Sequence, residues 1–194
     1  MAELIPPGSA VFRERFEQFR YSVFRLETLQ SYGNSGEDPA LEAFQAGHPH
    51  LVTPGKQRWT AMIRANAHAG RTLQRVHVVT EPISEYLRFE LTWGYGPNVE
   101  AGEEIRIIPV PEGDPWPVDL PHRDYWLFDA RELYDMHYEA DGTWLGTEPV
   151  TDPDRIVQAC TWRDAALFHA VPWSEYVATH PELTRHVEAL ARAS

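Results

Sequence analysis

Residues 71–129 read RTLQRVHVVTEPISEYLRFELTWGYGPNVEAGEEIRIIPVPEGDPWPVDLPHRDYWLFD and decide the fold of the chain. Apolar residues occupy both faces of 72–80, a pattern typical of a central strand. Pro82 stands where a helix tolerates proline, so a helix is predicted to begin there and to exit through Asn98 and Gly102. The strands that follow are expected at 105–108 and 125–128. The order strand, helix, strand indicates an α/β domain.

The segments on either side supply helices and one hairpin. Phe12, Phe16 and Phe19 recur at helical spacing, so residues 10–23 are predicted to be helical. The segment 24–29 fits either an extension of this helix or the start of a strand. The other expected elements are helices at 38–44, 57–69, 153–170 and 182–191, and hairpin strands at 132–139 and 143–149 around Asp141-Gly142.

The chain is therefore predicted to be a single domain over 1–194, with a mixed sheet of about five or six strands. It divides into a helical N-terminal part at 10–69, an α/β core at 71–171 and a C-terminal helix within 172–194. The N-terminal helices are expected on one face of the sheet and the C-terminal helix on another.

The composition argues against several classes of function. The net charge is −12 and no compact lysine and arginine cluster offsets it, so direct binding to nucleic acid or to an anionic membrane is not expected. No apolar run approaches the roughly 18 residues of a membrane span, and the N-terminus lacks the pattern of a secretory signal. The single cysteine, Cys160, is typical of a protein in the reducing cytoplasm. We expect an acidic, cytoplasmic protein.

Glu90 is the most informative candidate residue. On a helix that starts at Pro82, its carboxylate falls in the middle of the apolar stripe. A carboxylate there is costly unless it is paired, and Arg75 and Arg106 lie on the neighbouring strands. We therefore predict an ion pair between Glu90 and one of these arginines. The pair either locks the helix to the sheet, which is the interpretation we favour, or belongs to a polar pocket that recognises an anionic group.

Further candidates border the predicted pocket. Asp124 and Asp129 bracket the aromatic strand, and strand-end carboxylates can line crevices, although turn formation is their more common role. Arg163, on the long helix, could join the Glu90 network or pair with Asp164. The candidate ligand-binding residues are Arg75, Arg88, Glu90, Arg106, Trp126 and Asp129.

No motif for catalysis, a metal or a cofactor accompanies these residues. His48 and His50 have a spacing that could hold a metal, but no third ligand is evident. A nucleophile elbow and a phosphate-binding glycine loop are also missing. We therefore predict no catalytic residue, no metal and no cofactor.

Three runs of sequence resemble an uncharacterised bacterial family, a domain of unknown function. They are AGRTLQRVHVVTEPISEYLRFEL at 69–91, AGEEIRI at 101–107 and RDYWLFD at 123–129. The likeness extends from about Phe16 to Tyr176. Members of that family occur in high-GC filamentous bacteria and are often encoded beside helix-turn-helix regulators. The resemblance implies such a regulator as a partner, and it implies no activity.

The order of elements is also similar, more distantly, to one half of a phospholipase D-like domain in its catalytically dead form. Active members need a histidine, a lysine two positions later and a downstream aspartate, and no His-x-Lys occurs in this chain. We predict a non-catalytic binding or regulatory module that acts with a transcription regulator or a small anionic ligand. The alternatives are a hydrolase of phosphate or nucleotide compounds, built on Glu90, Arg75 and Arg106, and a component of a toxin–antitoxin pair.

Overall fold

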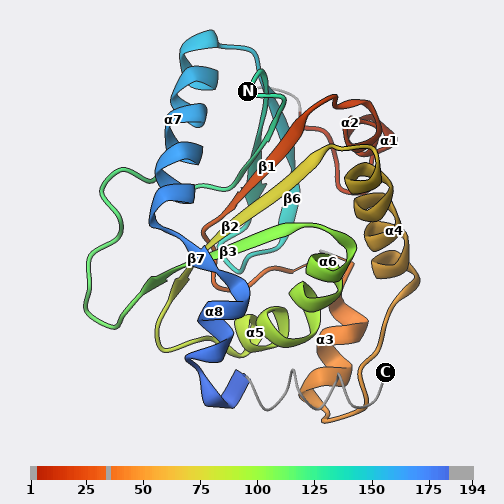
Figure 1. The fold of residues 1–194 in the computed structure, drawn as a ribbon, viewed down its shortest axis with the longest axis vertical. Helices are drawn as coiled ribbons and strands as arrows, with labels where there is room; N and C mark the ends of the chain where they lie inside the picture. The colour runs from red at the N-terminus through yellow and green to blue at the C-terminus, as the bar shows by residue number, and fades with distance from the viewer. Residues whose placement is uncertain (1–3, 34–35, 184–194) are drawn as a thin grey trace.

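A computed structural model describes residues 4–33 and 36–183 of the chain. Within these residues a seven-stranded mixed sheet in the order β6-β5-β4-β1-β2-β3-β7 runs through the molecule (Figure 1). The strands are β1 Ser22–Glu27, β2 Thr72–Thr80, β3 Glu104–Val110, β4 Tyr125–Phe128, β5 Glu132–Tyr138, β6 Trp144–Val150 and β7 Val171–Pro172. The helices are α1 Ala10–Arg13, α2 Arg15–Gln18, α3 Asp38–Gln45, α4 Pro54–His68, α5 Glu85–Phe89, the π-helix η1 Glu90–Gly94, α6 Tyr95–Ala101, α7 Pro153–His169 and α8 Trp173–Ala178.

The sheet confirms the predicted single α/β domain. Strands β1, β2 and β3 are parallel, whereas β4, β5, β6 and β7 pair antiparallel with their neighbours. Strand β1 resolves the segment that fitted either a helix or a strand, and it places part of the supposedly helical region 10–69 at the centre of the sheet. The strand beyond the expected number is β7, which has only two residues.

The two faces of β1 and β2 differ in chemistry. Phe24 and Leu26 of β1 point to the face that α7 covers. Arg25 and Glu27 alternate with them and point to the other face, since side chains along a strand alternate. The parallel register sets Arg25 beside Arg75 and Glu27 beside His77. One face of the sheet centre is therefore apolar and the other is charged.

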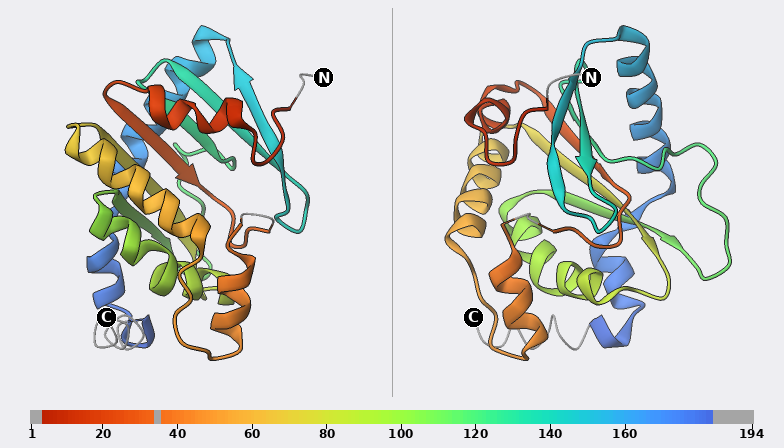
Figure 2. Two further views of the ribbon diagram at one scale, coloured as in Figure 1. Left: turned by 90° about the vertical axis from the view of Figure 1, so that its right-hand side faces the viewer. Right: turned by 180° about the vertical axis from the view of Figure 1, so that it is seen from behind.

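The predicted N-terminal helices cover one face of the sheet as expected, and α7, rather than the predicted C-terminal helix, covers the other. In Figure 2, α1, α2 and α4 lie across one face of the sheet and α7 lies behind it. The predicted helix at 10–23 is wrong beyond Gln18, because Phe19 has extended backbone angles and β1 begins soon after. The phenylalanine pattern still marked burial correctly, since Phe12, Phe16 and Phe19 belong to one core cluster.

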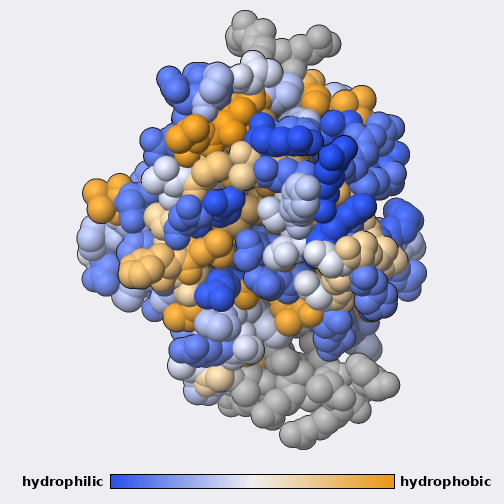
Figure 3. All heavy atoms as spheres, turned by 45° about the horizontal axis from the view of Figure 1, so that its top comes forward, coloured by the Kyte–Doolittle hydropathy of each residue, from blue (hydrophilic) through white to orange (hydrophobic). Residues whose placement is uncertain are grey.

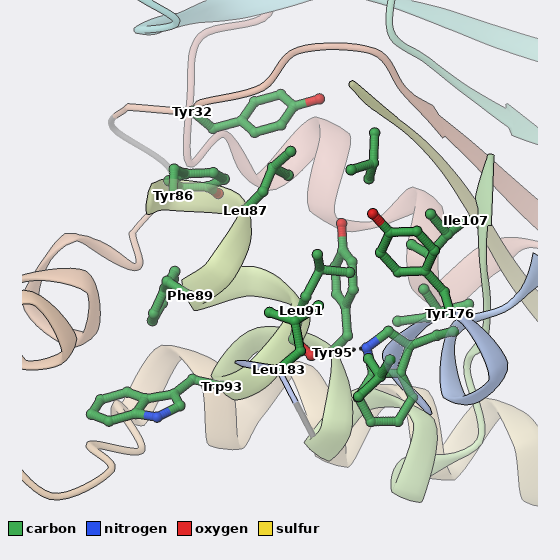
Figure 4. Close-up of a cluster of buried hydrophobic side chains, with 14 of the residues drawn as sticks. Tyr32, Tyr86, Leu87, Phe89, Leu91, Trp93, Tyr95, Ile107, Tyr176 and Leu183 are labelled. Atoms are coloured by element: carbon green, nitrogen blue, oxygen red, sulfur yellow. Dashed lines mark hydrogen bonds between the residues drawn. The ribbon is translucent and has the colours of Figure 1, made fainter. Parts of the chain in front are cut away.

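The segment after β2 differs from its prediction at the start. Its first helix begins at Glu85 rather than at Pro82, and the Ser84 hydroxyl caps it by accepting a hydrogen bond from the Leu87 amide. The helical path then continues through η1 and α6, so Asn98 lies inside a helix and only Gly102, with a φ of 111°, ends it. This path packs against α8 and the sheet in the aromatic and aliphatic cluster shown in Figure 4.

The end of the described chain adds one unpredicted helix. Trp173 of α8 donates from its indole nitrogen to the Leu91 carbonyl at 2.9 Å, which ties α8 to the π-helix. The helix predicted at 182–191 lies almost wholly outside the described residues. On the face in Figure 3, hydrophobic residues lie in small groups among hydrophilic ones. None of the helices described is long and apolar enough to cross a membrane.

Candidate functional site

A cavity of about 450 Å³ opens on the charged face of the sheet. Strands β1, β2 and β4 form its floor, through Arg25, Glu27, Arg75 and Trp126. Helices α1, α2, α4, α5 and α6, the π-helix η1, the loop after β1 and the β5–β6 hairpin contribute its walls. The site is thus assembled from segments that span most of the chain.

The floor is a chain of buried ion pairs. Arg25 Nε lies 3.4 Å from Glu27 Oε1, and Arg75 Nη1 lies 2.7 Å from the same oxygen. Arg25 Nη2 contacts Asp124 at 2.8 Å and Arg75 Nε contacts Glu103 at 2.9 Å. Burial by itself would raise the pKa of Glu27, but Arg75 and Arg25 hold it well below its usual range. The floor therefore keeps its charges, because each buried ion has a partner of opposite sign.

Asp124 is a hub of this network. It accepts hydrogen bonds from the Thr28 amide at 2.8 Å and hydroxyl at 2.7 Å. The hydroxyls of Tyr32 and Tyr138 donate to it at 2.7 and 3.2 Å. Turn formation, the common role of such aspartates, therefore does not describe Asp124: its side chain is fully covered and accepts hydrogen bonds from four residues.

His77 extends the network away from the cavity. Its Nδ1 lies 2.6 Å from the Tyr95 hydroxyl, and its Nε2 lies 2.8 Å from the Leu29 carbonyl. The Tyr95 hydroxyl donates to Glu27 Oε2 at 2.9 Å. Burial lowers the pKa of His77, against the opposing effect of Glu27. The imidazole therefore positions the Tyr95 hydroxyl, and through it the Glu27 carboxylate.

Three buried polar atoms of the cavity lining have no hydrogen-bond partner in the described part of the chain. They are Arg25 Nη1, Asn98 Oδ1 and Trp144 Nε1. Arg25 is only 3% exposed and Asn98 only 2%. Buried polar groups are nearly always hydrogen-bonded, so unpartnered ones in a cavity need a physical reason.

Two aromatic groups flank the floor. The first aromatic group consists of Phe16, Trp59 and Trp126, whose ring centroids lie 4.8 to 6.1 Å apart. The second aromatic group places Tyr32 at 5.7 Å from Tyr86 and 5.5 Å from Tyr138. Figure 4 shows the Tyr32 and Tyr86 rings close together.

Arg25 touches both aromatic groups. Its guanidinium lies 5.2 Å from the centroid of the Trp126 ring and donates to the Tyr138 hydroxyl at 2.8 Å. The two groups are therefore joined through the floor of the cavity.

Glu90 lines the cavity but forms no ion pair with either predicted arginine. Arg75 pairs with Glu27 and Glu103, and Arg106, on the opposite face of β3, donates to the Ala170 carbonyl at 3.4 Å. The prediction failed because it placed the helix start at Pro82, three residues early, and assumed regular α-helical phase.

The buried Glu90 carboxyl group has a raised pKa. Burial and the nearby Glu37 carboxylate raise the pKa of Glu90 well above its usual range, and Lys56 opposes them. The Tyr86 hydroxyl donates to Glu90 Oε1 at 3.2 Å. Gly94 makes room for the carboxyl group, because a Cβ at this position would lie 2.8 Å from Glu90 Cδ. A raised pKa favours the uncharged carboxyl group, which is the form whose burial costs less.

The structure brings together three of the six predicted ligand-binding residues. Arg75, Glu90 and Trp126 line the cavity. Arg88 is exposed on α5, and Arg106 is half-buried on the α7 side of the sheet. Asp129 lies in the turn after β4 with a φ of 50°, the role that was favoured for it, and its carboxylate accepts three backbone amide hydrogen bonds from Arg20, Tyr21 and Ser22. Arg163 pairs with Asp164 at 2.7 Å, which settles the alternative left open by the sequence.

Sequence reasoning missed most of the floor. The run VFRLE carried a usable signal, because Arg25 and Glu27 alternate with Phe24 and Leu26 at the two-residue period of a strand. Tyr32, Trp59 and Tyr138 carried no local signal, since an aromatic residue in a core and one in a cavity wall look the same in sequence.

The fold and site define an α/β domain with an aromatic-walled cavity over a buried ion-pair network. Residues 10–178 match DUF6879, a domain of unknown function, and the chain belongs to this family. No curated protein matches the chain significantly.

Two solved structures share features of the fold. The first is Nuc, a phospholipase D family member from Salmonella typhimurium, with a TM-score of 0.49 and 9% identity over 89% of this chain and 95% of that chain. The second is phosphatidylserine synthase from Haemophilus influenzae Rd KW20, with a TM-score of 0.48 and 10% identity over 100% of this chain and 45% of that chain. These likenesses concern the fold and say nothing of the activity of this chain.

Proposed function

We propose that the domain is a non-catalytic module that binds a small molecule in the cavity above β1 and β2. The volume of about 450 Å³ falls within the range of about 300–1,000 Å³ that is common for ligand sites. The observation that carries the proposal is Arg25 Nη1, a buried guanidinium nitrogen without a hydrogen-bond partner in the described residues. Leaving such a donor unpaired is costly, and the acceptor atom of a ligand that displaces the side chains covering it would recover that cost.

The chemistry of the lining supports binding over catalysis. Among the described lining residues there is no histidine, cysteine or threonine, and the serine present, Ser9, caps α1. The arginines and Glu27 already hold one another in ion pairs. A serine, threonine or cysteine nucleophile activated by histidine therefore cannot be built from this part of the lining.

A helix-turn-helix regulator remains the proposed partner of the module. The family resemblance in sequence supports this part of the proposal. The net charge of −12 supports a role on DNA through a partner rather than through direct contact. Recovery of such a regulator at a stoichiometric level with the native protein would support it, and recovery of the protein alone would oppose it.

Hydrolysis is a second candidate, favoured by one observation. Glu27 and Glu90 line the same cavity, and the pKa of Glu27 is lowered whereas that of Glu90 is raised. Carboxyl groups whose pKa values are pushed apart are typical of acid–base pairs in enzymes. Turnover of bis(4-nitrophenyl) phosphate that disappears in Glu90→Gln would move the assignment to a hydrolase.

A fragment screen by ligand-observed NMR tests the binding proposal. At least one fragment should bind the wild-type protein, and its affinity should fall at least about ten-fold in Trp59→Ala, because that change removes part of the first aromatic group. Trp116→Ala is the matched control, since Trp116 stacks on His122 outside the cavity. Fragments that bind both variants equally, or an absence of any binding fragment, would contradict the proposal.

A further inference from the structure

We propose that the cavity takes a flat aromatic ligand whose buried end is polar but uncharged, such as a primary carboxamide or a lactam edge, rather than an anion. This inference rests on the proposed binding function and concerns the chemical class of the ligand. It departs from the anionic ligand that the sequence suggested.

The charge balance of the floor disfavours an anion. Two guanidinium groups, of Arg25 and Arg75, are shared among the three carboxylates of Glu27, Glu103 and Asp124. Each arginine already contacts two of these carboxylates, so no positive charge is left over for a ligand. A carboxylate or phosphate pushed into this site would lose its hydration and meet a surplus of negative charge.

The charges nearer solvent do not change this balance. Lys56 pairs with Glu37 at 3.2 Å, and Arg13 is exposed. A charge on the ligand can lie beside these groups in water, where salt and solvent weaken its interactions. The restriction to an uncharged group therefore applies to the end of the ligand that reaches the floor.

Asn98 defines the hydrogen-bonding partner of that end. Its Nδ2 donates to Glu103 Oε2 at 2.8 Å, and a carboxylate can only accept, so this contact fixes the orientation of the amide. Oδ1 is then left as an acceptor and Arg25 Nη1 as a donor, both without a partner among the described residues and both covered by the lining, so the ligand pairs with them by displacing neighbouring side chains. A carboxamide or lactam supplies both an acceptor and a donor, whereas a carboxylate supplies acceptors only.

The aromatic walls of the cavity favour a flat ligand. Nine of the described lining residues are aromatic: Phe12, Phe16, Tyr32, Trp59, Tyr86, Tyr95, Trp126, Tyr138 and Trp144. Aromatic pairs prefer stacked or edge-to-face contacts, so such walls gain most from a ligand that is itself an aromatic ring. The two aromatic groups on either side of Arg25 offer ring contacts to a molecule whose polar end meets the guanidinium.

Three probes that share one bicyclic body test the inference: 2-naphthamide, 2-naphthoate and 2-naphthylmethylamine. Titration of the protein at pH 7 should give at least about ten-fold tighter binding of the amide than of the carboxylate. A carboxylate or an amine that binds as tightly as the amide overturns the inference. Failure of all three probes, while another fragment saturates the cavity, also overturns it but leaves the proposed function standing. Failure of every fragment removes the proposed function itself.

Glu103→Gln tests the proposed cause of the preference. A glutamine at this position removes one negative charge, and it can donate to Asn98, so the amide of Asn98 can turn its NH₂ group toward the cavity. The preference for the amide probe should then shrink at least about three-fold or reverse in favour of 2-naphthoate. Glu104→Gln removes the same charge from an exposed neighbour that contacts Gln74, and it should leave the ratio unchanged. An unchanged ratio in a folded Glu103→Gln variant overturns the inference; should that variant not fold, the probe series on the wild-type protein decides.

Discussion

Arg25 and Asp124 stand 99 residues apart in sequence and meet in the core, with Nη2 and Oδ2 separated by 2.8 Å. The contact joins the middle of β1 to the residue before β4. Both side chains are almost completely buried, so water hydrates neither charge and each is stabilised by its partner. The pair is therefore a structural support of the fold as well as part of the cavity floor.

Asp124→Ala should be strongly destabilising. It removes the acceptor of Arg25, Thr28, Tyr32 and Tyr138 at once and leaves Arg25 with an incomplete set of partners. Breaking one side of a buried pair costs about 3–5 kcal/mol, and thermal unfolding should show a loss of several degrees.

Asp119→Ala is the control for this loss. Asp119 contacts His169 at 3.1 Å with both side chains more than 40% exposed, so its removal should cost under about 1 kcal/mol. Equal melting temperatures for the two variants would show that the floor contributes no more than a surface pair.

Glu90→Gln should become more stable than the wild-type protein as the pH rises. The pKa of Glu90 is raised in the folded state above an ordinary value of 4.5, so the folded protein holds the proton longer than the unfolded chain. The stabilising contribution of the acid form is complete below about pH 4.5 and is lost as the pH increases through the folded-state pKa. Glutamine does not titrate and keeps the acceptor for Tyr86.

Chemical denaturation at pH 4 and pH 8 measures the effect. The two proteins should have similar free energies of unfolding at pH 4, and the variant should gain up to about 1.4 kcal/mol for each pH unit of the shift. Glu85→Gln, at an exposed position on α5, should follow the wild-type curve. A wild-type protein that is the more stable of the two at pH 8 would mean that Glu90 is ionised and paired.

Gly94→Ala should destabilise the domain through a single added methyl group. The new Cβ would lie 2.8 Å from Glu90 Cδ inside a buried π-helical turn, and overpacking of this kind costs about 1–3 kcal/mol. Gly96→Ala, whose Cβ would meet only Trp173 at 3.8 Å, should be neutral or mildly stabilising.

The double variant Gly94→Ala, Glu90→Ala identifies the cause. If the clash with Glu90 is responsible, the double variant should lose less stability than the sum of the two single changes, a coupling that a double-mutant cycle measures. Additive losses would place the strain elsewhere in η1.

The isolated chain should not bind duplex DNA. Its net charge is −12, and association with phosphates requires cationic side chains that displace counterions. A mobility-shift assay with micromolar protein at moderate salt should show free DNA only. A retarded band under these conditions would contradict the expectation and remove the need for a partner in any role on DNA.

Local pattern predicted the regular elements well where one physical signal dominated. Strands β2 and β4 have the boundaries that were expected, because short apolar stretches flanked by polar or turn-forming residues define them. The start of α5 was misplaced because Pro82 suggested a helix, while the hydroxyl of Ser84 supplied the actual cap. The π-helix was not foreseen, since its widened turn depends on packing around Glu90 and Gly94 rather than on propensity.

The candidate site was only partly predictable for a related reason. Arg75, Glu90 and Trp126 stood out because a charge or a large ring occurred in an apolar context. Their partners could not be deduced, since Arg75 could pair with any carboxylate that the fold brings near. Glu27 and Glu103 are chosen by strand order and register, which are tertiary properties.

The place of β1 between β2 and β4 has a consequence for synthesis on the ribosome. Asp124, the partner of Arg25, is translated 99 residues after it, and the edge of β1 that pairs with β4 stays open until then. At about 5–20 residues per second, this interval lasts roughly 5–20 seconds. A chain that stalls before β4 therefore exposes an unpaired edge of the charged strand β1 and lacks Trp126, which is part of the cavity floor.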